Sequence, residues 1–200
     1  MRGAHPLGRA SQIEAVARYS RAAMWFHWSI ALLIMLAASL ALFRESFASV
    51  AAEMISTHKM VGLAILILSL GRLAWRLTHR PPPFLPTVGR WEGRGAHTVH
   101  ALLYIFMIAV PVAGWIFTSA APHGSPVDYA GWNSVPRLPL SPDRTISWFW
   151  HEVHELMGFA LIGLFFLHIA GALKHQFFGN DDELSRMAPW IGKSRSRKRL

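Results

Sequence analysis

The sequence predicts an all-α integral membrane protein, built as a bundle of four transmembrane helices. Of its 200 residues, 52% are hydrophobic and only 16% are charged, which is unlike an ordinary soluble domain. Four segments are long and apolar enough to cross a hydrocarbon core of about 30 Å, which takes about 20 helical residues. Connections rich in proline, glycine and polar residues separate them. The four segments are residues 22–43, 55–77, 96–120 and 147–173.

The elements follow in a simple order. Residues 1–21 form a basic extension without the apolar core of a signal peptide, so we expect the first helix itself to act as the insertion signal. The membrane domain is expected to span residues 22–178, and a basic tail of residues 179–200 follows it. Proline clusters cannot continue a helix and therefore mark the connections. The connections read RESFASVAAEM, HRPPPFLPTVGRWEGRG and PHGSPVDYAGWNSVPRLPLSPDR.

The basic residues predict the orientation of the bundle. With the N-terminus inside, only four of the 20 Lys and Arg residues would lie outside, namely Arg44, Lys59, Arg137 and Arg144. The positive-inside rule therefore predicts that both termini are cytoplasmic. The net charge of +9 then belongs to the cytoplasmic side. A basic tail after a last span is typical of topology signals or contacts with anionic lipid, so we do not expect nucleic-acid binding.

The absence of cysteine narrows the chemistry. With no Cys, the chain has no disulfides, no covalent haem on a Cys-x-x-Cys-His motif and no Cys-ligated iron–sulfur cluster. The sequence also contains no zinc finger, P-loop, nucleophile elbow or dinucleotide fingerprint. Any redox cofactor would depend on His, Met or oxygen ligands.

Four histidines fall at two predicted depths. His27 and His168 lie toward the inner ends of the first and fourth helices, while His58 and His154 lie toward the outer ends of the second and fourth. The 14 residues between His154 and His168 correspond to about 21 Å of helix and leave both within about 40° of one face. His151 falls about 100° away from that face, so we expect it beside the aromatic residues at the membrane surface.

This arrangement is what two stacked haem b groups require, each with axial imidazoles from two helices. Ligation by two histidines suits electron transfer. A zinc site would need three or four ligands at one depth. We predict that His27 and His168 bind an inner haem iron and that His58 and His154 bind an outer one. The alternative, that each histidine is a polar contact between helices, remains open.

Further polar residues cluster near the inner end. His97 and His100 share one helix face and suit haem ligation, contacts to a propionate or quinone, or a purely interfacial role. His175 lies seven residues after His168 and is a candidate contact for a quinone headgroup. Arg72 and Arg76 are candidates for pairing with haem propionates or for snorkelling to the surface. Four glycines are candidates for small positions that let a helix or a porphyrin approach closely: Gly62, Gly114, Gly158 and Gly163.

These motifs resemble the bacterial cytochrome b561 family. The resemblance covers about residues 18–190, and it is carried by YSRAAMWFHW, STHKMVGLAILILSLGRLAWR, AHTVHALLYIFMIAVPVAGW, HELMGFALIGLFFLHIAGALKHQFF and RMAPW. It implies a four-helix dihaem protein of the bacterial inner membrane, with the same four histidines as ligands and with His100 and His175 on the quinone side. The best-known type of member oxidises superoxide outside the membrane and passes the electrons to ubiquinone. This chain departs in a longer N-terminal extension and a longer connection between the third and fourth helices.

Three functions remain in view. The first is an oxidoreductase that takes electrons from superoxide at the outer face and reduces ubiquinone near the cytoplasmic face. The second is a haem-bearing anchor subunit, which passes electrons between a partner dehydrogenase or carrier protein and quinone. The third is a membrane protein without redox activity, whose histidines are structural or carry protons.

Overall fold

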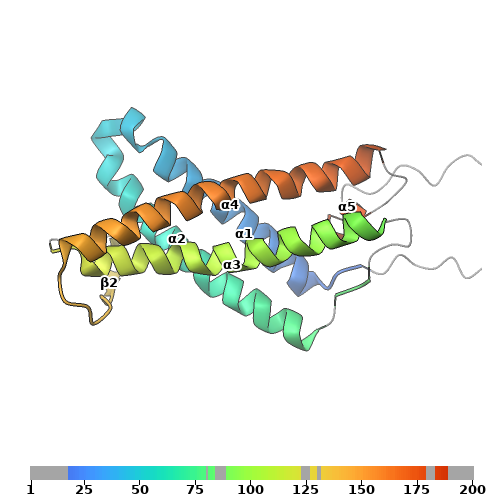
Figure 1. The fold of residues 1–200 in the computed structure, drawn as a ribbon, viewed down its shortest axis with the longest axis horizontal. Coiled ribbons are helices and arrows are strands. Elements are labelled where there is room, and N and C mark those ends of the chain that lie inside the picture. Colours follow the sequence, from blue (N-terminus) through green and yellow to red (C-terminus); the bar gives the residue numbers. More distant parts are fainter. Residues whose placement is uncertain are drawn as a thin grey trace, which may run out of the picture.

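The protein folds as a bundle of four long helices (Figure 1). This computed structural model describes residues 18–79, 81–83, 89–122, 127–129, 132–178 and 183–188. The N-terminal extension up to residue 17 and the tail from residue 189 lie outside the described residues. The elements are α1 (Arg21–Leu42), η1 (Arg44–Val50), α2 (Ala51–Thr78), α3 (Arg90–Ala120), β1 (Val127–Tyr129), β2 (Trp132–Val135), α4 (Arg144–Phe178) and α5 (Glu183–Met187).

Helices α3 and α4 lie side by side, and α1 and α2 pack together and cross them at an angle (Figure 1). Residues before α1 and the short helix α5 lie together at one end of the bundle, which we call the terminal end. The 3₁₀ turn η1 and the strands β1 and β2 lie at the opposite end, which we call the hairpin end. Each long helix therefore connects one end to the other.

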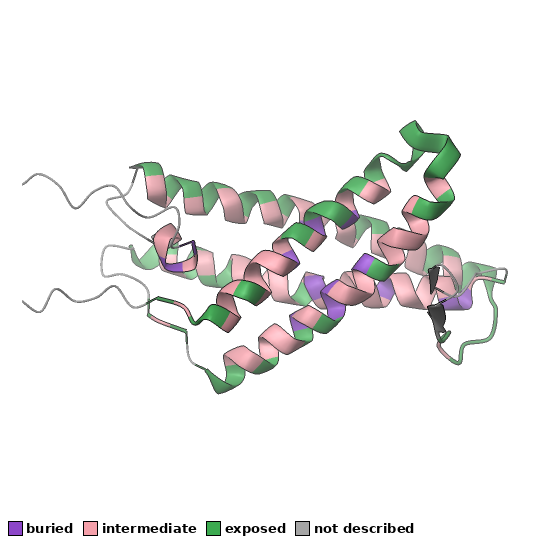
Figure 2. Cartoon of the chain, turned by 180° about the vertical axis from the view of Figure 1, so that it is seen from behind, coloured by how far each residue is buried: buried purple, intermediate pink, exposed green. Residues whose placement is uncertain are grey.

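In the part of the chain that the structure describes, four helices are long and apolar enough to cross a membrane. Exposed positions occur along all four helices (Figure 2). Many of them carry large apolar side chains, among them Leu32, Ile67, Ile105 and Phe166. A soluble protein would leave few such residues in continuous contact with water. Helices α2, α3 and α4 extend beyond the apolar segments predicted from the sequence, whereas α1 matches its segment to within one residue at each end. Helix α4, with 35 residues, is about 52 Å long, more than the hydrocarbon core requires. The hydropathy pattern marks only the part of a helix that lies within the hydrocarbon core of the membrane. Polar residues on either side of that part can continue the same helix.

Small and branched side chains fill the centre of the bundle. The buried cluster has members from all four helices: Ile30, Ile34, Ala37, Val61, Ile65, Met107 and Leu161. It lies between the two ends and thus separates the two histidine pairs described below. Tight apolar packing excludes water from the path between the ends.

Local sequence signals explain where two helices begin. The Ser20 side chain accepts a hydrogen bond from the backbone N–H of Ala23 at 3.2 Å, and so caps α1. The Asp143 carboxylate accepts from the N–H groups of Thr145 and Ile146 at 2.7 and 3.0 Å, and so caps α4. Both caps satisfy backbone donors that the first turn leaves without helical partners.

The 3₁₀ turn η1, the strands β1 and β2 and the short helix α5 were not predicted. The connection before α4 contains an antiparallel pair, in which Val127 lies opposite Val135 and Tyr129 opposite Trp132. The tail contains α5, which returns to the bundle: the Trp28 indole Nε1 donates to the Met187 carbonyl at 3.0 Å. Arg186 is 2% exposed and donates to the Pro83 carbonyl at 2.9 Å. The tail therefore begins as part of the folded domain.

Candidate functional site

The structure brings together two pairs of histidines, one toward each end of the bundle. At the hairpin end, the ring centroids of His58 on α2 and His154 on α4 are 6.0 Å apart. At the terminal end, those of His27 on α1 and His168 on α4 are also 6.0 Å apart. Two imidazoles on opposite sides of one metal ion, with bonds of about 2.0 Å, have ring centres about 6 Å apart. The spacing of both pairs therefore suits a shared metal ion.

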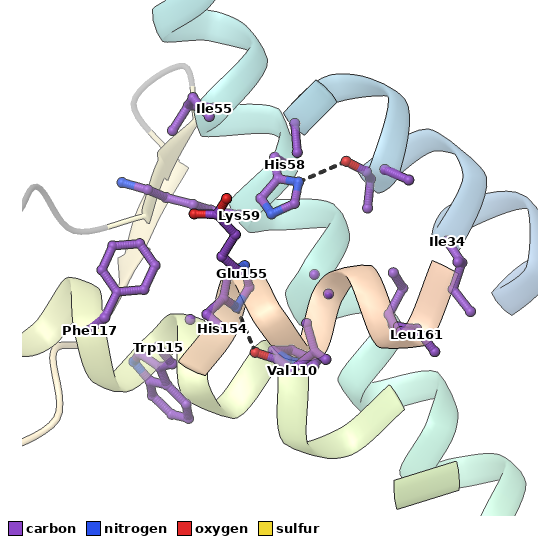
Figure 3. Close-up of a pocket in the computed structure, with 18 of the residues that line it drawn as sticks. Ile34, Ile55, His58, Lys59, Val110, Trp115, Phe117, His154, Glu155 and Leu161 are labelled. Atoms are coloured by element: carbon purple, nitrogen blue, oxygen red, sulfur yellow. Dashed lines mark hydrogen bonds between the residues drawn. The ribbon is translucent and has the colours of Figure 1, made fainter. Parts of the chain in front are cut away.

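Backbone carbonyls orient both rings of the hairpin-end pair (Figure 3). His58 Nδ1 lies 2.9 Å from the Ala37 carbonyl oxygen on α1, and His154 Nδ1 lies 2.9 Å from the Val110 carbonyl oxygen on α3. Because a carbonyl oxygen only accepts, each Nδ1 must carry the hydrogen. The other ring nitrogen, Nε2, then has a free lone pair, which is the form of histidine that binds a metal.

Gly114 permits the close approach of His154 to α3. A Cβ at this position would lie only 3.0 Å from both Nδ1 and Cε1 of the His154 ring. Gly114 is one turn beyond Val110, whose carbonyl accepts the hydrogen bond. A larger residue would therefore push the ring away from its acceptor. The glycine proposed from the sequence as a small contact position is accordingly in contact with one of the candidate ligands.

A cavity of about 630 Å³ adjoins this pair (Figure 3). Sites for cofactors usually enclose about 300–1,000 Å³. The cavity is mainly apolar, and it is lined from α1, α2, α3 and α4, including both histidines and Gly62, Gly114 and Gly158. A Cβ added at Gly62 or Gly158 would meet nothing within 4 Å, so these glycines border open space. The charged residues among its lining are Arg44, Glu45, Lys59 and Glu155.

The terminal-end pair has a different environment. The His27 ring packs edge-on against Trp28 at 5.2 Å, and His27 Nδ1 is buried with no hydrogen-bond partner in the described parts of the chain. His100 on α3 is the third histidine here, with its ring centroid 5.1 Å from that of His168. The His100 ring is thus closer to His168 than the 6.0 Å that separates His27 from His168, and three histidines meet at this end.

Two arginines approach the terminal-end pair from α2. The guanidinium carbons of Arg72 and Arg76 lie 5.5 and 5.6 Å from the centre of the Tyr104 ring on α3. Such cation–π contacts hold a charge at a defined place without a carboxylate. Arg72 is close enough to interact electrostatically with both His27 and His168. An acidic group bound here would find two cations.

The remaining candidates are not members of the two pairs, and one of them, His151, lines the same cavity as the hairpin-end pair. His151 packs edge-on against Phe117 at 5.3 Å, and its Nδ1 is 3.5 Å from a Glu152 carboxylate oxygen. His97 is exposed on α3. His175 lies one residue beyond Lys174, whose Nζ is 2.7 Å from a Glu92 carboxylate oxygen on α3. His100, one of the two histidines expected on the quinone side, lies against a member of the terminal-end pair, His168.

Comparison with known proteins identifies the family. The model of the family described as prokaryotic cytochrome b561 matches residues 18–190. The chain belongs to this family. As a cytochrome b561 family protein it is a membrane electron carrier, and the family implies haem b as its cofactor.

Three relatives place the chain within the cytochrome b561 proteins. Cytochrome b561 homolog 2 of Escherichia coli (strain K12) is 30% identical over 139 residues, which cover 70% of this chain and 71% of the relative. Cytochrome b561 homolog 1 of the same organism is 27% identical over 177 residues, 86% of this chain and 97% of the relative. Probable superoxide oxidase CybB of Yersinia pestis is 28% identical over 184 residues, 86% of this chain and 96% of the relative.

The residues present fit haem b. The hairpin-end pair combines an imidazole spacing of 6.0 Å, Nδ1 atoms held by carbonyls and a mostly apolar cavity bordered by glycines. A flat apolar macrocycle needs such a cavity, and its iron needs a ligand on each face. The terminal-end pair has the same spacing and adds two cations that suit propionates.

Sequence reasoning missed the partners that hold these histidines. The acceptors for His58 and His154 are backbone carbonyls, which carry no sequence signal. It also missed the contact of Trp28 with Met187, by which the tail packs against the residue next to His27. The only hint was the RMAPW segment, which belongs to the family resemblance but has no chemistry of its own.

Proposed function

We propose that this cytochrome b561 protein carries electrons across a bacterial inner membrane through two haem b groups. The observation that carries the proposal is the pair of equal 6.0 Å imidazole spacings at opposite ends of the bundle. On α4 the two ligand positions are 14 residues apart, or about 21 Å. When bound, haem b would supply one-electron transfer, and two histidines would hold each group.

The chain's own residues would hold and orient the cofactors. His58 and His154 present Nε2 because their Nδ1 atoms donate to carbonyls. His27 and His168 form the second pair. In this proposal Arg72 and Arg76 bind propionates at the terminal end. The apolar cluster between the pairs excludes water. Electrons could therefore cross the bundle without a hydrated path for protons or ions beside them.

We further propose that superoxide is oxidised at the hairpin end and that ubiquinone is reduced at the terminal end. Two superoxide anions would each lose one electron and leave as dioxygen, and the two electrons with two protons would convert ubiquinone to ubiquinol. One relative, 28% identical, carries the name probable superoxide oxidase. Lys59, next to His58, and Arg44 line the cavity and offer local positive charge to an anion.

At the terminal end, the quinone contacts proposed are His100 and His175. His100 lies against His168, at 5.1 Å between ring centroids, so a quinone bound to it would be close to the second pair. An imidazole is a suitable hydrogen-bond donor for a quinone oxygen. His175, seven residues farther along α4, would contact the headgroup nearer the surface.

The proposed orientation has both termini in the cytoplasm and the hairpin end outside. The support is the charge distribution, since only four of the 20 Lys and Arg residues belong to the hairpin-end side. Superoxide would then be met outside the cytoplasm, and quinone would take up protons from the cytoplasmic side.

The test uses the purified, haem-loaded chain with an enzymatic source of superoxide and a short-chain ubiquinone. We expect superoxide to disappear faster than by spontaneous dismutation, with ubiquinol formed in a ratio of one per two superoxide anions. The His58→Ala variant should lose both readouts. If protein with two intact haems changes neither rate, the superoxide proposal is wrong, and co-purification of a dehydrogenase or carrier protein would support the anchor-subunit function instead.

A further inference from the structure

Residues 183–188, which we call the strap, tie three segments together at the terminal end. The Arg186 guanidinium donates to the carbonyl of Pro83, in the segment after α2, at 2.9 Å. The Arg186 carbonyl accepts from the backbone N–H of Tyr19, just before α1, at 3.4 Å. The Met187 carbonyl accepts from the indole of Trp28, within α1, at 3.0 Å. The chain that follows α4 therefore returns to the beginning of the first helix and to the end of the second.

Buried contacts hold the strap in place. Arg186 is 2% exposed and Ala188 is 0% exposed. A guanidinium can be buried only where its donors find acceptors, and here it has the Pro83 carbonyl and lies 5.9 Å from the centre of the Tyr19 ring. Helix α5, with five residues, is too short to be stable by itself. Its position therefore depends on these contacts.

The strap packs on two residues that neighbour the terminal-end pair. One is Trp28, whose ring also packs edge-on against His27 at 5.2 Å. The other is Tyr19, which is close enough to Arg72 to interact with it electrostatically. Arg72 in turn interacts with both members of the pair. The strap thus lies over the surroundings of this pair at the end of the bundle (Figure 1).

The sides of the bundle near the same end are apolar. Trp25 on α1, Leu77 on α2 and Phe177 on α4 are 58%, 78% and 71% exposed. In a membrane protein such side chains contact lipid and the membrane interface. The terminal end is therefore covered by the strap along the axis of the bundle, and it is bounded by lipid at its sides.

We propose that the strap shields the terminal-end haem from water and thereby selects the class of electron acceptor that this end can use. The acceptor is a molecule dissolved in lipid, which arrives from the side, and a water-soluble acceptor is kept away. Electron transfer slows steeply with distance, so a strap that holds an aqueous oxidant off is enough to exclude it. This inference rests on the proposed function, and it adds Arg186 and Ala188 as residues that decide the acceptor class.

The test compares a water-soluble and a lipid-soluble one-electron oxidant on the purified, haem-loaded full chain in lipid nanodiscs. All chains carry His58→Ala, so that the terminal-end haem is the one left and every electron leaves there. The chains are reduced with dithionite, freed of it, and mixed with ferricyanide, which becomes ferrocyanide, or with an alkyl-ferrocenium, which becomes the ferrocene. The absorbance of the haem gives both rates.

Arg186→Gln should make oxidation by ferricyanide about tenfold faster, because losing a charged hydrogen bond raises the population with a detached strap by about that factor. The rate with the alkyl-ferrocenium should not change. Ala188→Glu places a carboxylate at a fully buried position and should have the same two effects. Both substitutions make this end less positive, which by charge alone would slow an anionic oxidant. Faster oxidation therefore reports access.

The matched control is Arg94→Gln, which removes a cation at the same end that lies 5.0 Å from the centre of the exposed Trp91 ring and away from the strap. It should not accelerate either oxidant. A second readout needs no electron transfer: amide hydrogen exchange in peptides covering the strap and Tyr19 should be faster in Arg186→Gln and unchanged in Arg94→Gln.

The outcomes separate the strap from the proposed function. The shielding role is wrong if amide exchange rises while the ferricyanide rate stays the same, if both oxidants accelerate equally, or if Arg94→Gln accelerates ferricyanide as much. If the His58→Ala chain holds no b-type haem, the proposed function is wrong instead, and the exchange data still show whether the strap is held by Arg186.

Discussion

Replacing Gly114 with alanine tests whether the close approach of His154 to α3 serves haem binding. The new Cβ would lie 3.0 Å from Nδ1 and Cε1 of His154, whereas ordinary contacts begin at 3.4 Å, so the ring must move by about 0.4 Å. The shift would lengthen and weaken the 2.9 Å hydrogen bond between the His154 ring and the Val110 carbonyl. The same change adds a methyl group to a helix, which by itself is stabilising.

The magnitude follows from three terms. Overpacking costs about 1–3 kcal/mol, and the weakened hydrogen bond costs about 0.5–1.5 kcal/mol. Replacing glycine inside a helix returns about 0.5–1 kcal/mol. The net penalty is about 2 kcal/mol, which corresponds to roughly 30-fold weaker haem binding at the hairpin end.

The assay is the haem content per chain after purification at limiting haem, together with the visible spectrum. The control is Gly163→Ala on α4, where an added Cβ meets nothing within 4 Å and the residue is not among those lining the cavity. Gly163→Ala should retain both haems, while Gly114→Ala should lose the hairpin-end haem preferentially. Equal haem content and identical spectra in the two variants would refute the role assigned to Gly114.

Three further predictions follow. His154→Ala should remove the hairpin-end haem from the spectrum, whereas His151→Ala should leave both haems, because His154 is the residue whose ring lies 6.0 Å from that of His58; loss of a haem from the His151 variant would reverse the assignment. Because the chain has no Cys, single cysteines report topology without background: in intact cells an impermeant maleimide should label Ser46→Cys in η1 and leave Thr78→Cys unlabelled, and the opposite pattern would invert the orientation. Arg186→Gln should lower the thermal unfolding midpoint, since its buried guanidinium donates to a backbone carbonyl and such bonds are worth about 1.5–3 kcal/mol; an unchanged midpoint would show that α5 adds no stability.

The sequence predicted the features that depend on local composition and on the helical repeat. Four apolar segments correspond to helices because length and hydropathy suffice to define a membrane span. The 14-residue spacing on α4 anticipated one histidine toward each end, since helical geometry converts sequence distance into depth. The same geometry predicted that His151 lies away from the face of His154, but in the structure both rings contact Phe117 and both residues line the same cavity.

The sequence could not predict interactions whose partners are distant or lack side chains. The carbonyls that orient His58 and His154 belong to other helices, and every residue has a carbonyl. The burial of Arg186 depends on α5 returning to the residues around Tyr19, over whose ring its guanidinium lies at 5.9 Å. His100 was left open between several roles, and only the three-dimensional packing places it 5.1 Å from His168.

The central claim is that each histidine pair binds one haem. Its most direct measurement is the haem content per chain and the reduced-minus-oxidised spectrum of the wild-type chain beside His168→Ala and His58→Ala. The account predicts two b-type haems in the wild-type chain, with one haem lost from each variant and different spectral components missing in the two. A wild-type chain with a single haem, or two variants that lose the same spectral component, would contradict it.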